Sequence, residues 1–470
     1  MMKLRELLNG LDILETNAGL DSDIREVRYD SRLVESGDLF IAVTGVETDG
    51  HKYIPMAREK GAACVLCERA PEDGAPFVRV ADSRRALAVV GGNRFDHPAR
   101  EMTMIGITGT SGKTTSTYLI KSILEQKAGA KVGLIGTIQN MIGDRVLHTE
   151  RTTPESFELQ KLLREMADAG CTHVVMEVSS HALMLDRVYG IPFAVGIYTN
   201  LSRDHLDFHK TMEAYCDAKA LLMRQCDVGI YNADDPLCVR IAERAANPSI
   251  AFGVDENLGL PQNSVADAQM CQRCSSMLEY DYRQYGQLGS FSCPTCGFAR
   301  PALDFAATGV KLGLSGLSFD VRRHGEGAAA GSIAAPYTGA YMVYNLLATA
   351  AAAGLAGCPL PSLQKAIDAF DPQNGRLQTF DIAGRRVLLN LAKNPTGFNQ
   401  NLKIVAQDAG DKVVAFFVND KEGDGRDVSW LWDIDFEELA GQSGLRVFAG
   451  GIRKNDDPAE GFLQFVRGAE

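Results

Sequence analysis

The sequence predicts an α/β protein, because short apolar runs alternate with amphipathic segments along most of the chain. The clearest case is the β-branched and apolar run Met104 to Ile107, which predicts a buried strand. A glycine-punctuated turn follows, and Ser116 to Gln126 has the spacing of an amphipathic helix. The length of 470 residues fits about three domains at ~100–200 residues each.

We expect a small N-terminal α/β domain over residues 1–98, a central domain over 99–356 and a C-terminal domain over 357–470. An insertion at about 266–302 interrupts the central domain. The glycine-punctuated turn lies in that central domain, so the predicted chemistry is concentrated there.

The composition of the chain restricts the kinds of molecule that we expect it to bind. A formal net charge of −12 at pH 7 argues against nucleic acid or an anionic membrane as the main partner. No apolar stretch is long enough for an integral membrane segment, and no early stretch resembles a signal peptide. The 11 cysteines are mostly scattered, which suits a reducing compartment. We therefore expect a cytoplasmic protein.

The stretch Thr108-Gly-Thr-Ser-Gly-Lys-Thr-Thr115 predicts a phosphate site. In such a loop the backbone N–H groups converge on a phosphate, and the helix dipole favours its charge. Lys113 would add a cation for the outer phosphates, and the Thr114 hydroxyl suits a Mg²⁺ ligand. The match to the P-loop pattern is imperfect, because its first glycine would fall at Ile107; the alternative is a Gly/Ser-rich turn before an ordinary helix. The residues expected to bind ATP are Gly109, Thr110, Ser111, Gly112, Lys113, Thr114 and Thr115.

Polar side chains follow two further strands, at the edge where open α/β sheets bind ligands. One buried strand ends at Glu177, and another over 194–198 precedes a segment that contains His205 beside Asp204. A lone histidine is usually structural, but the density of metal-capable groups here favours function. Lys219 follows in a predicted helix, where an exposed structural lysine is the alternative.

Two Cys-x-x-Cys pairs about twenty residues apart predict a structural Zn²⁺ site, because four thiolates complete a closed tetrahedron. The aromatic-rich hairpin expected over 278–291 has too little core to fold without the metal. Cys64 and Cys67 have the same spacing but no second pair nearby, so we interpret them as core residues. The four predicted ligands are Cys271, Cys274, Cys293 and Cys296.

Four segments resemble motifs of the Mur ligase family, the ATP-dependent amide-forming enzymes of peptidoglycan precursor synthesis. They are Thr108-Gly-Thr-Ser-Gly-Lys-Thr-Thr115, Glu177-Val-Ser-Ser-His181, Thr199-Asn-Leu-Ser-Arg-Asp-His205 and Asn232-Ala-Asp-Asp235. Residues 1–235 resemble the MurE branch, which adds the third amino acid to UDP-MurNAc-L-Ala-D-Glu. Residues 228–470 resemble the MurT branch, which amidates D-glutamate in lipid II. The MurT resemblance is carried by the four cysteines, Asn390-Leu-Ala-Lys-Asn-Pro395 and Asp424-Gly-Arg-Asp-Val-Ser-Trp430.

The resemblance implies a three-domain Mur ligase fold, in which a central P-loop ATPase domain carries a zinc-ribbon insertion and the C-terminal Rossmann-like domain is shortened. It also implies the chemistry. ATP phosphorylates a substrate carboxylate, an amine or ammonia attacks the acyl phosphate, and phosphate leaves. Because two anions must approach each other, cations and preorganised N–H groups have to stabilise the accumulating charge.

Roles for individual residues follow from the same resemblance. Lys113 would hold the phosphates, Thr114 and Glu177 would hold one Mg²⁺, and His205 would help to hold a second. Lys219 matches a position that is carbamylated in MurE, where the added carboxylate supports metal binding. The implied nucleotide contacts from later in the chain are Asn345, for adenine, and Arg376, for a phosphate. The implied substrate contacts are Thr152, Thr153, Ser179 and Arg187, with Ser31 and the 45–51 loop at the UDP site.

The C-terminal third favours the MurT branch over the MurE branch. The Asp-Asn-Pro-Arg signature of MurE for the incoming diamino acid is absent from it. In MurT, the Asp-Gly-x-Asp-x-Ser-Trp segment supplies an aspartate to the catalytic triad of a glutaminase partner, GatD; the candidate here is Asp427, with Asp424 second. We therefore expect MurT-like amidation of a D-glutamate carboxylate with ammonia from such a partner. The alternatives are MurE-like addition of an amino acid to UDP-MurNAc-L-Ala-D-Glu and a non-catalytic nucleotide-binding scaffold subunit.

Overall fold

The computed structural model describes residues 1–451 apart from 46–47, 73, 128, 262–268, 326–329, 371–377, 420–428 and 441. Two compact units divide the chain: residues 1–105 with 130–194, and residues 106–129 with 195–470. Among the described residues, no helix is both long and apolar enough to cross a membrane.

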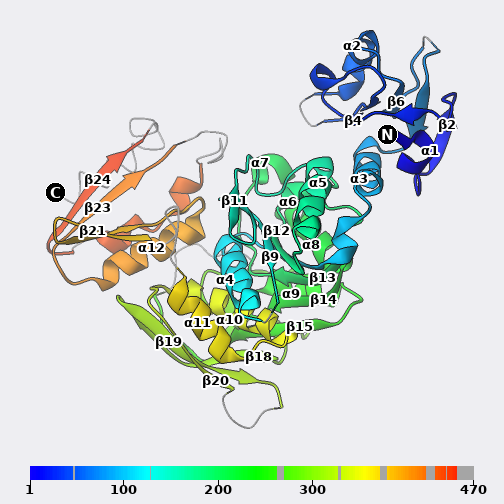
Figure 1. Cartoon of the computed structure of the whole chain (residues 1–470). Helices are drawn as coiled ribbons and strands as arrows, with labels where there is room; N and C mark the ends of the chain where they lie inside the picture. Colours follow the sequence, from blue (N-terminus) through cyan, green and yellow to red (C-terminus); the bar gives the residue numbers. More distant parts are fainter. Residues whose placement is uncertain are drawn as a thin grey trace. The chain divides into compact units, whose positions relative to one another are not determined.

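The N-terminal part of the first unit is a five-stranded sheet with the order β2-β7-β6-β5-β4 (Figure 1). Strands β4 to β7 run parallel, and β2 pairs antiparallel with β7. Side chains alternate between two apolar clusters: Leu39 and Ile41 belong to one, whereas Phe40 and Ala42 belong to the other. The elements are β1 (Met2–Lys3), α1 (Leu4–Leu7), β2 (Ile13–Thr16), β3 (Asp23–Ile24), β4 (Val27–Arg28), η1 (Ser31–Leu33), β5 (Leu39–Ile41), η2 (Gly50–Tyr53), α2 (Ile54–Glu59), β6 (Cys64–Cys67), β7 (Phe77–Val80) and α3 (Ser83–Arg94).

The alternation on β6 also explains Cys64 and Cys67. Cys64 packs into one of the two clusters and Cys67 into the other, so their thiols lie on opposite faces of the sheet. Burial raises the pKa of Cys64 to about 12 and that of Cys67 to about 11. The interpretation of both as core residues is confirmed.

The remainder of the first unit pairs β12 parallel with β9, and β10 antiparallel with β9. Helix α5 buries Leu159, Leu163 and Met166 on one face, which is the spacing of an amphipathic helix. The elements are η3 (Pro98–Glu101), β9 (Val132–Ile135), β10 (Asn140–Ile142), β11 (Arg145–Leu147), α5 (Ser156–Asp168), β12 (His173–Glu177) and α6 (Ser180–Met184). Strand β8 (Thr103–Thr108) begins in the first unit and ends in the second.

The second unit has a sheet in which β14, β15 and β18 run parallel and β18, β19 and β20 run antiparallel. The helix α10 is buried almost all round because it packs against β14, β15 and β18 as well as α4 and α11 (Figure 1). The elements are α4 (Lys113–Glu125), β13 (Phe193–Tyr198), α7 (Leu206–His209), α8 (Met212–Gln225), β14 (Cys226–Asn232), α9 (Pro236–Glu243), β15 (Ser249–Val254), β16 (Glu279–Tyr285), β17 (Leu288–Ser292), β18 (Phe305–Gly313), β19 (Gly316–Arg323), β20 (Gly331–Ala335), α10 (Ala340–Leu355) and α11 (Leu360–Ala369).

The C-terminal part of the second unit has its own small core, formed by α12, β23 and residues 431–439. Phe398 and Leu402 of α12 pack there with Phe416, Leu431 and Phe436. Strands β21 and β22 pair antiparallel, and β23 and β24 pair parallel. The elements are β21 (Gln378–Ile382), β22 (Arg385–Leu389), α12 (Pro395–Gln407), β23 (Lys412–Phe417), η4 (Ser429–Asp433), η5 (Phe436–Leu439) and β24 (Leu445–Gly450).

The helix after the glycine-punctuated turn differs from the prediction at its start. It begins at Lys113, not at Ser116. Its first turn is polar because it borders the loop, so hydrophobic periodicity gave no signal there. The strand that ends at Glu177 and the hairpin predicted over 278–291 are confirmed.

Candidate active site

Two glycines shape the loop between β8 and α4. Gly109 and Gly112 have φ angles of 142° and 87°, a region that favours glycine. A Cβ atom at Gly109 would lie 1.9 Å from the hydroxyl oxygen of Thr199, and one at Gly112 would lie 2.2 Å from Oδ1 of Asn345. The backbone of this loop therefore passes directly against its neighbours, as a cradle for a phosphate requires.

The segment that follows β13 holds the loop in place. The Thr110 N–H donates to the Asn200 carbonyl, and the Ser111 N–H donates to Oδ1 of Asn200, both at 2.9 Å. The Ser202 N–H donates to Oγ1 of Thr110 at 3.0 Å. The sequence marked the stretch 199–205 for its metal-capable groups, and it gave no indication that the first half of this stretch supports the loop.

Two lysines converge on the loop. Lys113, the first residue of α4, donates from Nζ to the carbonyls of Gly109, at 2.8 Å, and Thr110, at 3.1 Å. Lys219 of α8 donates to the same Gly109 carbonyl at 2.8 Å and to the Thr108 hydroxyl at 3.3 Å. Burial, together with the Lys113 ammonium, lowers the pKa of Lys219. The alternative of an exposed structural lysine is wrong for Lys219, which is fully buried beside the loop.

His205 lies directly before α7 with a left-handed backbone, φ 52°. Its Nε2 is 3.6 Å from the Asp204 carboxylate. Partial burial is the main cause that lowers its pKa, the charge of Asp204 opposes that shift, and Lys113 and Lys219 add to it. A lowered pKa favours the neutral imidazole at pH 7, which is the form that binds metals.

A hollow opens beside the loop, and Ser111, Gly112, Thr115 and Asn345 contribute to its wall. Its aromatic lining residues are Tyr285, Tyr337, Tyr341 and Phe370, and its amide lining residues are Asn200, Gln287, Asn345, Asn390, Gln400 and Asn401. An aromatic, amide-rich concavity next to a phosphate loop suits the nucleoside part of a nucleotide. The sequence indicated Asn345 through resemblance alone, and no local pattern marked the residues at 285–288 or 396–401.

In the first unit, Glu177 ends β12 with a buried and well-supported carboxylate. Thr137 donates to it from both its N–H and its hydroxyl, each at 3.0 Å. The Thr153 hydroxyl donates to the Glu177 carbonyl at 2.9 Å, and the hydroxyls of Thr137 and Thr152 lie 3.1 Å apart. The carboxylate therefore has a fixed orientation at the end of the strand.

The predicted substrate residues lie around the same strand end. The Ser179 N–H donates to the Thr153 hydroxyl at 3.2 Å, and the Ser179 side chain caps α6. Arg187 donates from Nη1 to the Thr153 carbonyl at 3.2 Å and lies 2.7 Å from the Glu155 carboxylate. Threonine hydroxyls, a helix N-terminus and a guanidinium are thus brought together in the first unit.

Ser31, the candidate for the UDP site, lies in the N-terminal part of that unit. It starts η1, is buried, and its hydroxyl lies 3.4 Å from the Met56 sulfur. In the 45–51 loop, residues 46–47 lie outside the described part of the chain, and Asp49 accepts the N–H of His51 at 3.0 Å.

Comparison with known proteins decides the family. The family model described as the Mur ligase middle domain matches residues 107–285, the Mur ligase family catalytic domain matches 23–93, and the MurT ligase C-terminal model matches 391–459. The UDP-N-acetylmuramoyl-L-alanyl-D-glutamate–2,6-diaminopimelate ligase of Clostridium botulinum is 35% identical over 404 residues, which are 84% of this chain and 73% of that protein. The chain belongs to the Mur ligase family.

Other Mur ligases give a consistent result. The ligase of the same name from Clostridium tetani is 46% identical over 269 residues, which are 56% of this chain and 55% of the relative, so this match spans about half of that protein. A solved 2,6-diaminopimelate ligase has a TM-score of 0.68 at 22% identity and covers 100% of this chain and 86% of that one. MurF from Thermotoga maritima in complex with ADP has a TM-score of 0.57 at 16% identity, with 94% and 86% covered. The multi-domain α/β Mur ligase fold is confirmed, and the chain is a ligase of the ATP-dependent, amide-forming class.

This Mur ligase carries the predicted cysteine cluster. The four sulfur atoms lie within 4.8 Å of one another. Cys271 and Cys296 are 3.5 Å apart at Sγ, as are Cys274 and Cys293. Sulfurs bound to one tetrahedral Zn²⁺ at about 2.3 Å would be separated by about 3.8 Å, so the donor set and its spacing fit that ion.

Both cysteine pairs use the same backbone turn. The Cys271 N–H donates to the Ser276 carbonyl, and the Cys293 N–H donates to the Phe298 carbonyl, both at 2.7 Å. In each turn the residue after the second cysteine has a positive φ: 61° at Ser275 and 72° at Gly297. Two matched turns that point their thiols at one centre are the structure that a four-cysteine metal site requires.

Several predictions for the C-terminal third fall outside the described residues. Asp427, Asp424 and Arg376 are among them, so their roles stay predictions. Of the two tryptophans nearby, Trp430 packs on the core with its ring 6.1 Å from that of Phe398, whereas Trp432 is 63% exposed.

Proposed function

We propose that this Mur ligase uses ATP to activate a D-glutamate carboxylate of a muramyl peptide and amidates it with ammonia. One observation carries the choice of the MurT-like reaction. The hollow beside the phosphate loop is lined by Leu391, Thr396, Gly397 and Gln400, all of which belong to the segment that matches the MurT ligase C-terminal model. Part of the wall that would surround the nucleotide therefore comes from the segment that matches the MurT ligase C-terminal model, and the rest comes from the phosphate loop and its neighbours.

In this proposal the loop residues 109–115 bind the phosphates of ATP, and Lys113 is the cation at the outer phosphates. Asn345 and the aromatic side chains of the hollow bind the nucleoside. The loop N–H groups and the lysine ammonium stabilise negative charge that accumulates as the carboxylate attacks the outer phosphate. In this structure the Lys113 ammonium donates to the Gly109 and Thr110 carbonyls, so it has to exchange these acceptors for phosphate oxygens when ATP binds.

We propose Thr114 and Glu177 as ligands of one Mg²⁺ and His205 as a ligand of a second. Hydroxyl and carboxylate oxygens are the donors that Mg²⁺ prefers, and the neutral form of His205 fits a ligand role. Bound Mg²⁺ neutralises phosphate charge. Glu177 suits this role because Thr137 fixes both of its carboxylate oxygens.

The muramyl peptide is assigned to the cluster of Thr152, Thr153, Ser179 and Arg187, where the guanidinium supplies a charge for a substrate carboxylate. Ser31 is the candidate for the uridine end of a UDP-linked substrate. The ammonia would come from a GatD-type glutaminase bound near Asp427. Cysteine usage and the nucleotide-linked substrate both favour a cytoplasmic location.

The second candidate function is the addition of an amino acid, and the relatives favour it. Those from Clostridium botulinum and Clostridium tetani are named as 2,6-diaminopimelate ligases. The third candidate, a nucleotide-binding scaffold, differs from both because it would release no product.

Product analysis separates these functions. We would incubate the chain with ATP, Mg²⁺ and UDP-MurNAc-L-Ala-D-Glu, and supply ammonium, glutamine, lysine or diaminopimelate in turn. With ammonium as the only nitrogen donor, we expect phosphate release and an amidated product, which mass spectrometry identifies. A product only with diaminopimelate or lysine would establish the MurE-like function instead. If no donor gives phosphate release, the nucleotide-binding scaffold is the remaining candidate function.

A further inference from the structure

The tip of the cysteine insertion forms part of the hollow beside the phosphate loop. The tip is defined here as residues 285–288, the turn between β16 and β17. Tyr285, Gln287 and Leu288 line the hollow together with Gly112. Their exposed fractions are only 5%, 3% and 2%. The tip is therefore packed into the body of the second unit, where a bound nucleoside would contact it.

Hydrogen bonds connect the tip to the support of the phosphate loop. Nε2 of Gln287 donates to the Leu201 carbonyl at 2.5 Å and to Oδ2 of Asp235 at 3.2 Å. The Leu201 N–H donates to the same Asp235 oxygen at 2.8 Å. The preceding residue, Asn200, is the one that holds the loop. The insertion is thus connected to the phosphate cradle through the adjacent residues Leu201 and Asn200, one of which contacts the tip and the other the loop.

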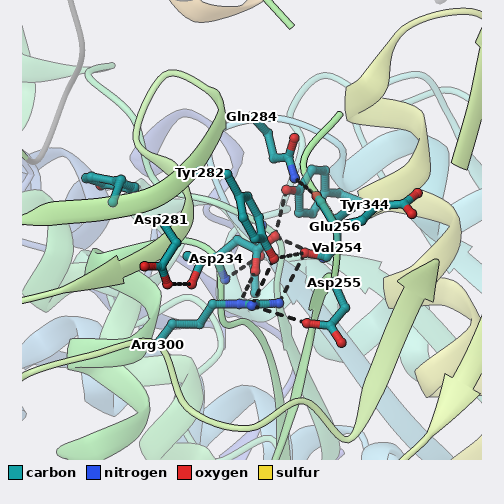
Figure 2. A network of polar contacts seen from close by, with 12 residues as sticks. Asp234, Val254, Asp255, Glu256, Asp281, Tyr282, Gln284, Arg300 and Tyr344 are labelled. Atoms are coloured by element: carbon teal, nitrogen blue, oxygen red, sulfur yellow. Dashed lines mark hydrogen bonds and ion pairs between the residues drawn. The ribbon is translucent and has the colours of Figure 1, made fainter. Parts of the chain in front are cut away.

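Arg300 fixes the other end of the insertion, as Figure 2 shows. Its Nε lies 2.7 Å from Oδ1 of the buried Asp234, and its other nitrogens donate to the Tyr282 hydroxyl and the Val254 carbonyl, both at 3.1 Å. The hydroxyl of Tyr344, on α10, donates to the second oxygen of Asp234 at 2.7 Å. Its ring packs edge-on against Tyr285 of the tip, with centroids 5.9 Å apart. The tip and the base of the insertion therefore share one buried network.

The cysteine cluster constrains the base of the strands that lead to the tip. Leu278, Phe291 and Phe298 belong to the same buried apolar cluster as Leu201 of the body. The rings of Phe291 and Phe298 are 5.3 Å apart, and those of Tyr280 and Phe291 are 6.2 Å apart. Without a metal, no bond joins the two cysteine turns to each other. The conformational entropy of the chain between them then opposes an ordered hairpin. Metal binding therefore orders the hairpin and, through it, the tip.

We propose that the hairpin tip is a wall of the nucleoside pocket, so that metal at the four cysteines and adenine nucleotide bind cooperatively. This proposal rests on the proposed ATP binding and adds a role to an insertion that would otherwise be structural only. Thermodynamic linkage requires the coupling to be reciprocal: the metal must raise nucleotide affinity by the factor by which the nucleotide raises metal affinity.

Calorimetry on the full chain tests the coupling. ADP is titrated without Mg²⁺ into zinc-loaded protein and into protein stripped by a zinc-selective chelator. We expect stripped protein to bind ADP about tenfold more weakly, within the usual range of site–site coupling, and added zinc chloride to restore the affinity. ADP should lower the apparent affinity of the chelator for the protein's zinc by a similar factor. Equal ADP affinity in the loaded and stripped forms would overturn the proposal.

A variant of the tip distinguishes contact with the nucleoside from contact with phosphate. Leu288→Ala should weaken ADP binding about tenfold while leaving the binding of inorganic tripolyphosphate and the zinc content unchanged. Retained tripolyphosphate binding also shows that the variant is folded. The matched control is Glu279→Gln, at an exposed position on the same hairpin. This variant should leave ADP binding, tripolyphosphate binding and zinc content unchanged.

Failure of the nucleoside wall and failure of the proposed ATP binding would give different results. An equal loss of ADP and tripolyphosphate binding in folded, zinc-loaded Leu288→Ala, or unchanged binding of both, contradicts a nucleoside wall. Failure of zinc-loaded wild type to bind either ligand contradicts the proposed ATP function itself.

Discussion

At the scale of single residues, the phosphate loop is notable for two lysines that share one acceptor. Lys113 and Lys219 both donate to the Gly109 carbonyl at 2.8 Å. Burial lowers the pKa of Lys219, and repulsion by the nearby Lys113 ammonium adds to that shift. A neutral amine at this position is a nucleophile that can add carbon dioxide, which makes the carbamylation implied for Lys219 chemically reasonable.

We predict that Lys219→Ala lowers turnover by at least about 10²-fold, because the substitution would remove the carbamate oxygen that the family resemblance implies as a support for metal binding. Added acetate or formate should restore part of the activity by supplying a carboxylate to the space left by the side chain. Steady-state phosphate release measures both effects. Lys161→Ala, at an exposed position on α5, is the control and should retain full activity. Full activity of Lys219→Ala without added carboxylate would exclude the carbamate role.

Asp235 leads to a prediction about pH. It is buried, accepts N–H groups from Leu201 and Leu237, and burial raises its pKa to about 6. An unfolded aspartate has a pKa of about 3.9, so between these values the folded state binds more protons than the unfolded state. The contribution of Asp235 to stability is therefore fully favourable below about pH 4 and falls as the pH rises to about 6, by about 3 kcal/mol in total.

Asp235→Asn removes this titration, although it also weakens the local hydrogen bonds. We predict that the melting temperature of the variant, relative to wild type, rises as the pH is increased from about 4 to about 7. Differential scanning calorimetry of both proteins over that range is the measurement. A difference that is independent of pH would mean that Asp235 has an ordinary pKa in the folded protein.

At the scale of elements, the parts of the site that are local in sequence could be predicted, and the long-range parts could not. The strand that ends at Glu177 and the cysteine pairs were visible because hydrophobic runs and fixed spacings mark them. The hydrogen bonds of Asn200 to the loop and the position of Gln287 at the hollow could not be predicted. Each depends on packing between segments that are far apart in the chain. Sequence periodicity carries no information about such contacts.

The insertion gives the prediction at this scale. Cys293→Ser removes one thiolate of the four, so we expect the purified protein to lose zinc and the hairpin to lose stability, because metal binding supplies much of the folding free energy of so small an element. Elemental analysis gives the metal content, and limited proteolysis followed by mass spectrometry locates the loosened segment. Cys171→Ser, at a buried cysteine outside the cluster, is the control for metal content. Full zinc content in Cys293→Ser would contradict the four-cysteine site.

At the scale of the whole molecule, the chain joins features of two branches of the Mur ligase family. Its similarity to 2,6-diaminopimelate ligases is highest over a segment that spans about half of those proteins, whereas residues 391–459 match the MurT ligase C-terminal model. The two branches use the same acyl-phosphate chemistry and differ in the nitrogen donor. The phosphate loop therefore does not determine the nitrogen donor, which would depend on other parts of the molecule.

The proposed role of Asp427 can be tested by comparing two nitrogen donors. A buried carboxylate can orient the histidine of a glutaminase so that its cysteine nucleophile is deprotonated, and removal of the negative charge impairs this step while leaving ammonia itself available. We predict that Asp427→Asn, assayed with a co-purified GatD-type glutaminase, lowers glutamine-dependent amidation by at least about 10²-fold and leaves ammonium-dependent amidation unchanged. Quantifying the amidated muramyl peptide with each donor measures the two rates. Asp424→Asn, at the second candidate for the triad aspartate, tests the alternative assignment in the same assay. If both donors fail equally in Asp427→Asn, this residue acts on the ligase reaction or on folding, and the source of the triad aspartate must be sought elsewhere.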